Sequence, residues 1–322
     1  MPLTRRLGST GIEVTRLCAG AAAWSSPDHP HGGSDPAESA DLADALFRGE
    51  VVRYLDTSNN YGYGESERRI GRAIRAAGGI PAGFVLQTKA DRDMATGDFS
   101  GPRMRESIAE SLDRLGLTHL PIVFLHDPEN TTWGRAMADD GPVAALVAAR
   151  DDGLIGHLGL SGGPVDLLAR FLETGHFEAV ITHNRYTLVD RSADPLLDLA
   201  AAQGIGVLNA APYGGGMLTR WPVDRSRYAY GEGAATLIDA ANEMGRLCAD
   251  AGVPFAAAAL QFSTRDPRIT STIVGMRTVG DLEASIQLDE TEIPEELWGA
   301  LLAVPLDPST WQDADRPAQS RS

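Results

Sequence analysis

The stretch YLDTSNNYGYGESERRIGRAI, residues 54–74, carries the strongest signal in the chain for both fold and site. An apolar run ends at Asp56, a loop of Gly, Asn and Ser holds Tyr61, and a helical pattern begins at a Ser-Glu pair. Binding and catalytic groups often stand on loops that a rigid scaffold positions. The stretch therefore predicts a strand, a functional loop and a helix as one unit.

Apolar runs of this kind recur and predict strands at residues 13–24, 51–58, 83–89, 120–126, 154–161, 177–184, 204–211 and 269–275. Segments with helical spacing lie between them, and several end at a glycine suited to a C-cap. Eight alternating units without a GxGxxG turn favour a closed (β/α)8 TIM barrel over an open doubly wound sheet.

We expect one α/β domain over residues 1–322, with an N-terminal β-hairpin at 1–16 that closes the barrel bottom and a polar, partly mobile tail at 306–322. Three connections after strands are longer than a barrel requires, at 25–38, 127–141 and 213–235. Long loops at that face predict a binding site.

The charge pattern restricts the partners. A net charge of −16 argues against nucleic acid and against an anionic membrane surface, so a small-molecule ligand is expected. Two cysteines in apolar contexts predict no disulfide framework and fit a reducing compartment. With no signal-peptide or membrane-span pattern, the cytoplasm is the expected location. The pattern leaves the oligomeric state open.

Polar residues follow the predicted strands on the face where barrel enzymes place their active sites. They are Asp56, Lys89, His126, Ser161, His183, Asn184 and Asn209. Each alone has an ordinary interpretation, such as a turn cap for Asp56, loop packing for Tyr61 or a bystander for His126. Their coincidence at successive strand ends favours catalysis.

Proton transfer is the chemistry that these groups predict. Tyrosine has a pKa of about 10, and a nearby ammonium lowers it by favouring the phenolate. Lys89 would supply that ammonium to Tyr61, Asp56 would keep Lys89 charged, and His126 would donate a hydrogen bond to the substrate oxygen. The set suits interconversion of an alcohol and a carbonyl.

The chain resembles the aldo-keto reductases. DTSNNYGYGESERRIG is similar to their signature, QTK matches the strand that carries their lysine, and SLDRLGLTHLPIVFLHDPE resembles the block that carries their histidine. The resemblance implies a catalytic tetrad of Asp56, Tyr61, Lys89 and His126. It also implies a nicotinamide dinucleotide bound without a Rossmann motif, with Ser161 at the carboxamide and residues 271–285 at the adenosine phosphate.

Several positions depart from that family. His183 replaces a glutamine, with Asn184 as a substitute carboxamide partner, and Ala210 replaces the tyrosine that stacks on the nicotinamide. Gly275 and Asp281 replace a phosphate-binding lysine and arginine. An aspartate would repel a 2′-phosphate, so NAD is expected, while Arg277 keeps NADP possible. Asn209 and Pro212 complete the cofactor residues that the resemblance implies.

The resemblance is closest to the aldose 1-dehydrogenase branch, which oxidises the anomeric hydroxyl of a sugar to a lactone. Loop aromatics suit a sugar ring, so we expect Trp24, Trp133 and Tyr213 to contact substrate beside Tyr61 and His126. A small aldehyde fits the same loops, which leaves an NADPH-dependent reductase as an alternative.

Two further functions stay open at this stage. The same fold serves as a cofactor-binding regulatory subunit, and the four tetrad residues do not separate that role from an enzyme. A metal-dependent hydrolase is disfavoured, because only His126 and His183 among seven histidines fall at strand ends, although His29 and His31 share a loop that could bind adventitious metal.

Overall fold

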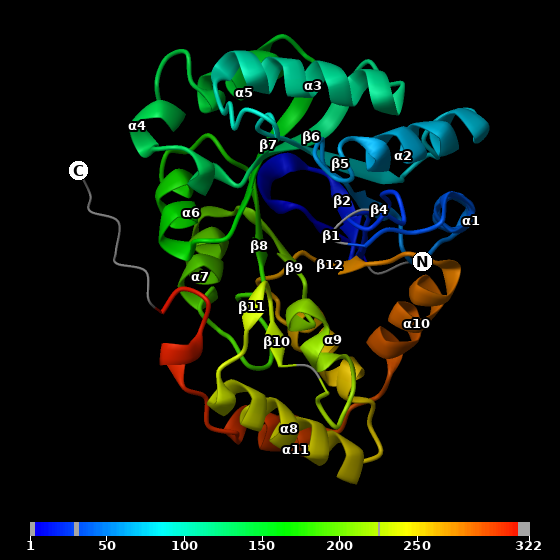
Figure 1. Cartoon of the computed structure of the whole chain (residues 1–322), viewed down its shortest axis with the longest axis vertical. Helices are drawn as coiled ribbons and strands as arrows, with labels where there is room; N and C mark the ends of the chain where they lie inside the picture. Colours follow the sequence, from blue (N-terminus) through cyan, green and yellow to red (C-terminus); the bar gives the residue numbers. More distant parts are fainter. Residues whose placement is uncertain (1–3, 29–31, 225, 315–322) are drawn as a thin grey trace.

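The computed structural model describes residues 4–28, 32–224 and 226–314. Eight parallel strands close into a barrel in the order β12-β3-β4-β5-β6-β7-β8-β9, which confirms the predicted (β/α)8 architecture (Figure 1). The strands are β3 (Leu17–Gly20), β4 (Tyr54–Asp56), β5 (Val85–Ala90), β6 (Leu120–His126), β7 (Ile155–Gly162), β8 (Ala179–His183), β9 (Gly206–Ala210) and β12 (Ser271–Gly275).

Helices surround the barrel in Figure 1. They are α1 (Pro36–Arg48), α2 (Glu65–Ala76), α3 (Gly101–Leu115), α4 (Trp133–Ala136), α5 (Pro142–Asp151), α6 (Val165–Leu172), α7 (Asp194–Gln203), α8 (Ala235–Asp250), α9 (Phe255–Thr264), α10 (Val279–Glu290) and α11 (Glu295–Ala303). The connection from β9 to β12 holds both α8 and α9. Helix α8 comes first and packs against α9 and α11, and α9 leads into β12 and contacts it.

An N-terminal hairpin closes the lower end of the barrel, as predicted. Strands β1 (Thr4–Arg6) and β2 (Glu13–Thr15) pair antiparallel, and Leu7 and Val14 join the apolar cluster inside the barrel. Gly8 has φ +54°, and a Cβ there would stand 2.3 Å from the Gly206 nitrogen at the start of β9. Only glycine tolerates both the conformation and the contact.

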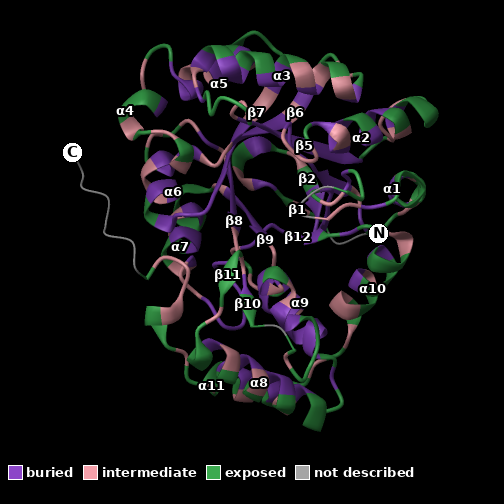
Figure 2. Ribbon diagram, in the orientation of Figure 1, coloured by how far each residue is buried: buried purple, intermediate pink, exposed green. Residues whose placement is uncertain are grey.

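Two apolar layers hold the fold together. One fills the barrel, and a larger one lies between the strands and the inward faces of the helices, which Figure 2 shows as buried strands within helices exposed on their outer side. Strand residues are therefore buried on both faces, which is the reason the sequence shows continuous apolar runs rather than simple alternation. Burial of this apolar surface is the main stabilising contribution to the barrel.

Local signals fix several helix ends. Ser100 caps α3, whose C-cap Gly116 is left-handed, and Thr278 with Asp281 forms a capping box at the start of α10. The long loops after β3, β6 and β9 lie where predicted, and the loop after β9 carries the short pair β10 (Arg227–Tyr228) and β11 (Gly231–Glu232).

The C-terminal segment returns to the barrel after α11. Asp313 accepts hydrogen bonds from Arg185 and from the backbone nitrogen of Val165 at the start of α6. This part of the predicted tail is therefore docked, and residues 315–322 lie outside the described residues. Across the part of the chain that the structure describes, no helix has the length and apolar character needed to cross a membrane.

Candidate active site

A cavity of about 460 Å³ opens at the carboxyl ends of the strands. Each barrel strand contributes at least one residue to its lining, and β8 and β12 contribute two each, because inward side chains recur every second residue along a strand. The eight lining residues nearest the carboxyl ends are Gly20, Asp56, Lys89, His126, Ser161, His183, Ala210 and Gly275, and Ile181 and Ile273 lie one layer lower. The predicted catalytic groups thus form the uppermost inward layer of the barrel.

Lys89 is the centre of the polar cluster on the cavity floor. Its Nζ lies 2.8 Å from Asp56 Oδ2, 3.0 Å from the Tyr61 hydroxyl and 2.9 Å from the carbonyl oxygen of Thr57. All three hydrogens of the ammonium therefore have oxygen partners, and the amine cannot turn away from Tyr61 without losing a buried hydrogen bond.

Asp56 is held from below by a second set of contacts. Gln87 Nε2 donates to Asp56 Oδ1 at 2.6 Å, and the Tyr54 hydroxyl donates to Gln87 Oε1. Gln87 points inward one layer below Lys89 on β5. These hydrogen bonds hold the Asp56 carboxylate in place, and Asp56 in turn holds Lys89. The positions of both side chains are therefore set before any ligand binds.

Burial and charge act in opposite directions on the lysine and the phenol. Burial alone would lower the pKa of Lys89, but Asp56 and Tyr61 outweigh it and raise that pKa above its ordinary value. Burial raises the pKa of Tyr61, and Lys89 offsets only part of that rise. The expectation of a lowered tyrosine pKa is therefore wrong for the protein alone, because desolvation of the phenolate exceeds the attraction of one ammonium.

His126 stands across the cavity from Tyr61, with its ring edge toward the phenol and 6.0 Å between the ring centroids. Its Nδ1 contacts Asp91 Oδ2 at 2.5 Å and Ser58 Oγ at 3.2 Å. Burial lowers the pKa of His126, but Asp127 and Asp91 more than compensate and raise it overall. The ring is thus oriented by partners behind it and presents Nε2 on the other side.

His183 forms the opposite wall with Tyr230. The two rings meet edge to face with centroids 5.8 Å apart, and Asn184 Nδ2 lies 3.3 Å from His183 Nδ1. Burial, aided by Arg185, lowers the pKa of His183 to about 4. This imidazole is therefore neutral near pH 7, unlike a histidine beside a carboxylate.

Two carboxylates that the sequence analysis did not predict, Asp127 and Glu129, also line the cavity. Asp127 follows β6 with a left-handed φ of +48° and places Oδ1 3.6 Å from His126 Nε2. Glu129 accepts a hydrogen bond from the Gly163 nitrogen, and its pKa is raised by burial and by Asp127. The sequence places both residues in a turn after β6, but it does not show whether a side chain in such a turn points into the cavity or into solvent.

The aldo/keto reductase family model matches residues 16–304, which is most of the chain. The chain belongs to the aldo/keto reductase family. It is an enzyme that uses a nicotinamide cofactor, NAD or NADP.

Curated relatives and a solved structure agree with this assignment. The chain is 29% identical to D-threo-aldose 1-dehydrogenase of Pseudomonas sp over 80% of this chain and 85% of the relative. It is 27% identical to L-galactose dehydrogenase of Arabidopsis thaliana over 95% and 96%. A holo-form aldo-keto reductase structure from Bacillus halodurans matches with a TM-score of 0.77, 20% identity and coverage of 98% and 99%, which supports the fold.

Three aromatic residues expected at the substrate of this aldo/keto reductase lie elsewhere. Trp24 is 0% exposed, and its Nε1 donates to the carbonyl oxygen of Met276 at 2.8 Å. Trp133 stacks against Arg170 and Phe171. Tyr213 is partly buried and packs against the apolar core. None of the three is among the residues that line the cavity, so the structure does not bring them to the Tyr61–Lys89 pair.

Several cofactor residues implied by the family resemblance also lie behind the cavity wall. Asn209 points outward from β9, since Leu208 and Ala210 point inward, and its Nδ2 donates to Tyr186 and Ser263. Pro212 is buried behind Ala211. Asn184 is 2% exposed and supports His183 instead of lining the cavity. Of this group, Ser161, His183, Ala210 and Gly275 do line it.

Arg277 and Asp281 lie at the N-terminus of α10, next to the Gly275 end of the cavity. Both are exposed, and Asp281 Oδ2 accepts hydrogen bonds from the backbone nitrogens of Arg277 at 2.8 Å and Thr278 at 3.2 Å. The carboxylate therefore binds the backbone donors just before the helix and places a negative charge at its N-terminus.

The cavity fits a nicotinamide group. Gly20, Ala210 and Ile273 leave an open apolar wall, while Ser161 and His183 supply polar atoms beside it. Asn184 Oδ1 is buried next to His183 without a hydrogen-bond partner among the described residues. Ser161 and His183 would hold the carboxamide, and Ala210 would face the ring.

Metal chemistry finds no support in the part of the chain that the structure describes. In that part, no group of three or more His, Cys, Asp or Glu side chains is arranged to hold a metal ion. His29 and His31, the loop pair noted in the sequence, lie outside the described residues.

Proposed function

We propose that this aldo/keto reductase oxidises the anomeric hydroxyl of an aldose to a lactone with NAD. The observation that carries the proposal is a cavity in which Asp127 and Tyr230 present polar groups beside the Tyr61–Lys89 pair. Carboxylates accept hydrogen bonds from the hydroxyl groups of a polyol. The names of two similar proteins, an aldose 1-dehydrogenase and a galactose dehydrogenase, point to the same substrate class.

The residues divide the proton chemistry among themselves. In oxidation Tyr61, as phenolate, takes the hydroxyl proton, and Lys89 at 3.0 Å stabilises the negative charge. Asp56 holds Lys89, and His126 orients the reacting oxygen from the opposite side. When bound, the nicotinamide supplies the hydride acceptor. Reduction uses the neutral phenol as the proton donor.

The raised pKa of Tyr61 gives this chemistry a pH dependence. At neutral pH the phenol is mostly protonated, so it is ready to donate in reduction and must lose its proton before oxidation. Oxidation should therefore speed up as the pH rises above neutral, whereas reduction does not need that deprotonation.

NAD is favoured by the N-terminus of α10. Asp281 places a negative charge on the backbone donors of Arg277 and Thr278, where it would repel a 2′-phosphate. The hydroxyls of an unphosphorylated ribose can instead donate to a carboxylate. Arg277 is the competing cation, so Asp281 and Arg277 together decide the preference.

Steady-state assays test the proposal directly. The purified protein is given NAD or NADP with a panel of D- and L-aldoses, and the reduced nicotinamide is followed by absorbance. We expect a higher kcat/KM with NAD, rates that rise with pH, and a lactone product trapped with hydroxylamine. Asp281→Asn should improve NADP use while leaving turnover with NAD similar.

The same enzyme is also assayed with NADPH and small aldehydes. Efficient aldehyde reduction without measurable aldose oxidation would replace the proposal by a reductase. Tight cofactor binding without turnover of any substrate would point to a regulatory subunit.

A further inference from the structure

Asp91 stands immediately after β5 and is fixed on every side. Its backbone nitrogen donates to Ser107 Oγ at 3.0 Å, and its carbonyl oxygen accepts from Arg103 Nε at 3.2 Å. Its Oδ1 accepts from the Arg92 nitrogen at 2.8 Å, and only 3% of the residue is exposed. The other carboxylate oxygen, Oδ2, contacts Nδ1 of His126.

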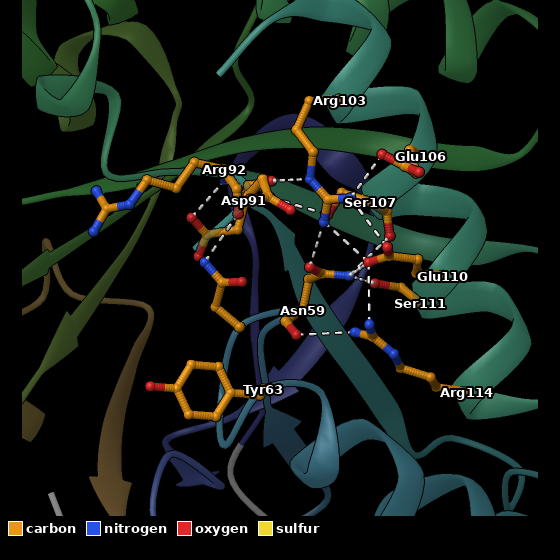
Figure 3. A network of polar contacts seen from close by, with 12 residues as sticks. Asn59, Tyr63, Asp91, Arg92, Arg103, Glu106, Ser107, Glu110, Ser111 and Arg114 are labelled. Carbon is orange, nitrogen blue, oxygen red and sulfur yellow. Dashed lines mark hydrogen bonds and ion pairs between the residues drawn. The ribbon is translucent and has the colours of Figure 1, made fainter. Parts of the chain in front are cut away.

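A network behind Asp91 explains this rigidity (Figure 3). Arg103 of α3 pairs with Glu110 and also donates to Asn59, which lies in the loop that carries Tyr61. The same Arg103 reaches the backbone of Asp91. The position of the carboxylate is thus set by α3 and by the catalytic loop together, not by a flexible turn.

The contact with Asp91 decides where His126 carries its proton. A carboxylate only accepts hydrogen bonds, so Nδ1 of His126 must be the donor. In the neutral ring the proton then sits on Nδ1, and Nε2 toward the cavity is an acceptor. Nε2 can donate to a substrate oxygen only when the ring is doubly protonated.

We propose that Asp91 is a positioning residue that fixes the Nδ1–H form of His126, so that Nε2 donates to the substrate oxygen only in the imidazolium. The consequence for turnover rests on the proposed oxidoreductase function of this cavity. Nε2 helps a carbonyl accept hydride when it is protonated, and it accepts a hydrogen bond from a substrate hydroxyl when it is not. The protonation state of His126 therefore biases the direction of the reaction.

The charges around His126 determine how readily its ring takes the second proton. Those facing it from the surrounding elements are Lys89, Asp91, Tyr61, Asp127, Glu129 and His183. The acidic members favour the imidazolium, and Lys89 and burial oppose it. The balance raises the pKa of His126 above its ordinary value, which favours the imidazolium.

The test uses nitrogen and proton NMR of the histidine rings in the whole protein. The His126 signals are identified as those lost in His126→Asn. In the wild type, the nitrogen shifts of the neutral ring should show the proton on Nδ1, with a pKa above the ordinary value. A proton on Nε2 in the neutral wild-type ring would overturn the proposal without any variant.

Asp91→Asn supplies the second measurement. The amide oxygen can keep the hydrogen bond from Arg92, which turns the NH2 group toward Nδ1 of His126. The neutral ring should then carry its proton on Nε2, and its pKa should fall by about one unit because the adjacent charge is lost. Asp93→Asn is the matched control, since the Asp93 carboxylate binds the Thr96 and Ala95 nitrogens on the exposed side of the loop.

The pH dependence of turnover separates the proposed role of Asp91 from a purely structural one, because a structural role would not change the pH profile. Wild-type carbonyl reduction should fall as the pH passes the measured pKa of His126, and this fall should be absent in Asp91→Asn. An unchanged pKa, proton position and pH profile in Asp91→Asn would reject the inference. Failure of the wild type to turn over any substrate would reject the proposed function instead, while the NMR result would still decide the role of Asp91.

Discussion

Lys89 shows how strongly surroundings set the properties of a single residue. A buried ammonium is unfavourable by itself, yet its contacts with Asp56, Tyr61 and the Thr57 carbonyl raise its pKa. The phenol gains less from the same contact, because burial disfavours the phenolate more than one cation favours it. The pair therefore rests as ammonium and neutral phenol, ready to donate a proton.

Removal of the phenol oxygen should abolish turnover. Tyr61→Phe deletes the only group that the mechanism uses for proton transfer to the substrate oxygen, so kcat should fall by about 10²- to 10⁴-fold. Cofactor affinity, measured by fluorescence titration, should stay the same, because Lys89 and Asp56 remain paired. Tyr63→Phe on the same loop is the control, since that ring is 62% exposed, and it should keep full activity. Substantial activity in Tyr61→Phe would remove Tyr61 from its assigned role.

The sequence predicted the tetrad but not the residues that tune it. Asp56, Lys89 and His126 follow apolar runs, so their places at strand ends could be inferred from pattern alone. Asp91 stands two residues after Lys89, so strand alternation alone is enough to put the two residues on the same side of the chain. Trp24 and Tyr213 pack against the core and do not line the cavity, because sequence pattern locates a loop without showing which of its side chains turn inward.

At the scale of elements, close helix contact supports the site. Gly71 of α2 lies against the end of α3, where an added Cβ would stand 2.0 Å from the Arg114 carbonyl oxygen. Arg114 in turn donates to the Asn59 carbonyl oxygen of the catalytic loop and pairs with buried Glu67. The distance between α2 and α3 therefore affects the position of the loop that holds Tyr61.

Two glycine substitutions should therefore change stability in opposite directions. Gly71→Ala forces α2 and α3 apart and should lower the free energy of unfolding by about 2 kcal/mol. Gly299→Ala in α11 places its methyl group in open space and should raise that free energy by about 1 kcal/mol, because alanine favours the helix. Urea unfolding measures both. A neutral Gly71→Ala would show that the helices can move apart at no cost.

At the scale of the whole molecule, the first and last described segments of the chain pack at opposite ends of the barrel. The N-terminal hairpin fills the bottom, and the C-terminal segment docks on the upper rim between β8 and α6. Arg185 joins this segment to the wall that carries His183, whose carbonyl oxygen it also contacts at 3.2 Å. The expected polar tail is therefore, at Gln312 and Asp313, a structural part of the rim.

Loss of the docking carboxylate should destabilise the protein. The Arg185 guanidinium is 6% exposed and makes two hydrogen bonds of 2.9 Å with Asp313. Asp313→Ala leaves this charge buried without its partner, so the free energy of unfolding should fall by about 3 kcal/mol. Asp307→Ala is the matched control in the same segment, since Asp307 only caps a short exposed turn at Ser309, and it should cost about 1 kcal/mol or less. Equal effects of the two substitutions in urea unfolding would mean that Arg185 finds water or another acceptor when Asp313 is gone, and that the C-terminal segment does not secure the rim.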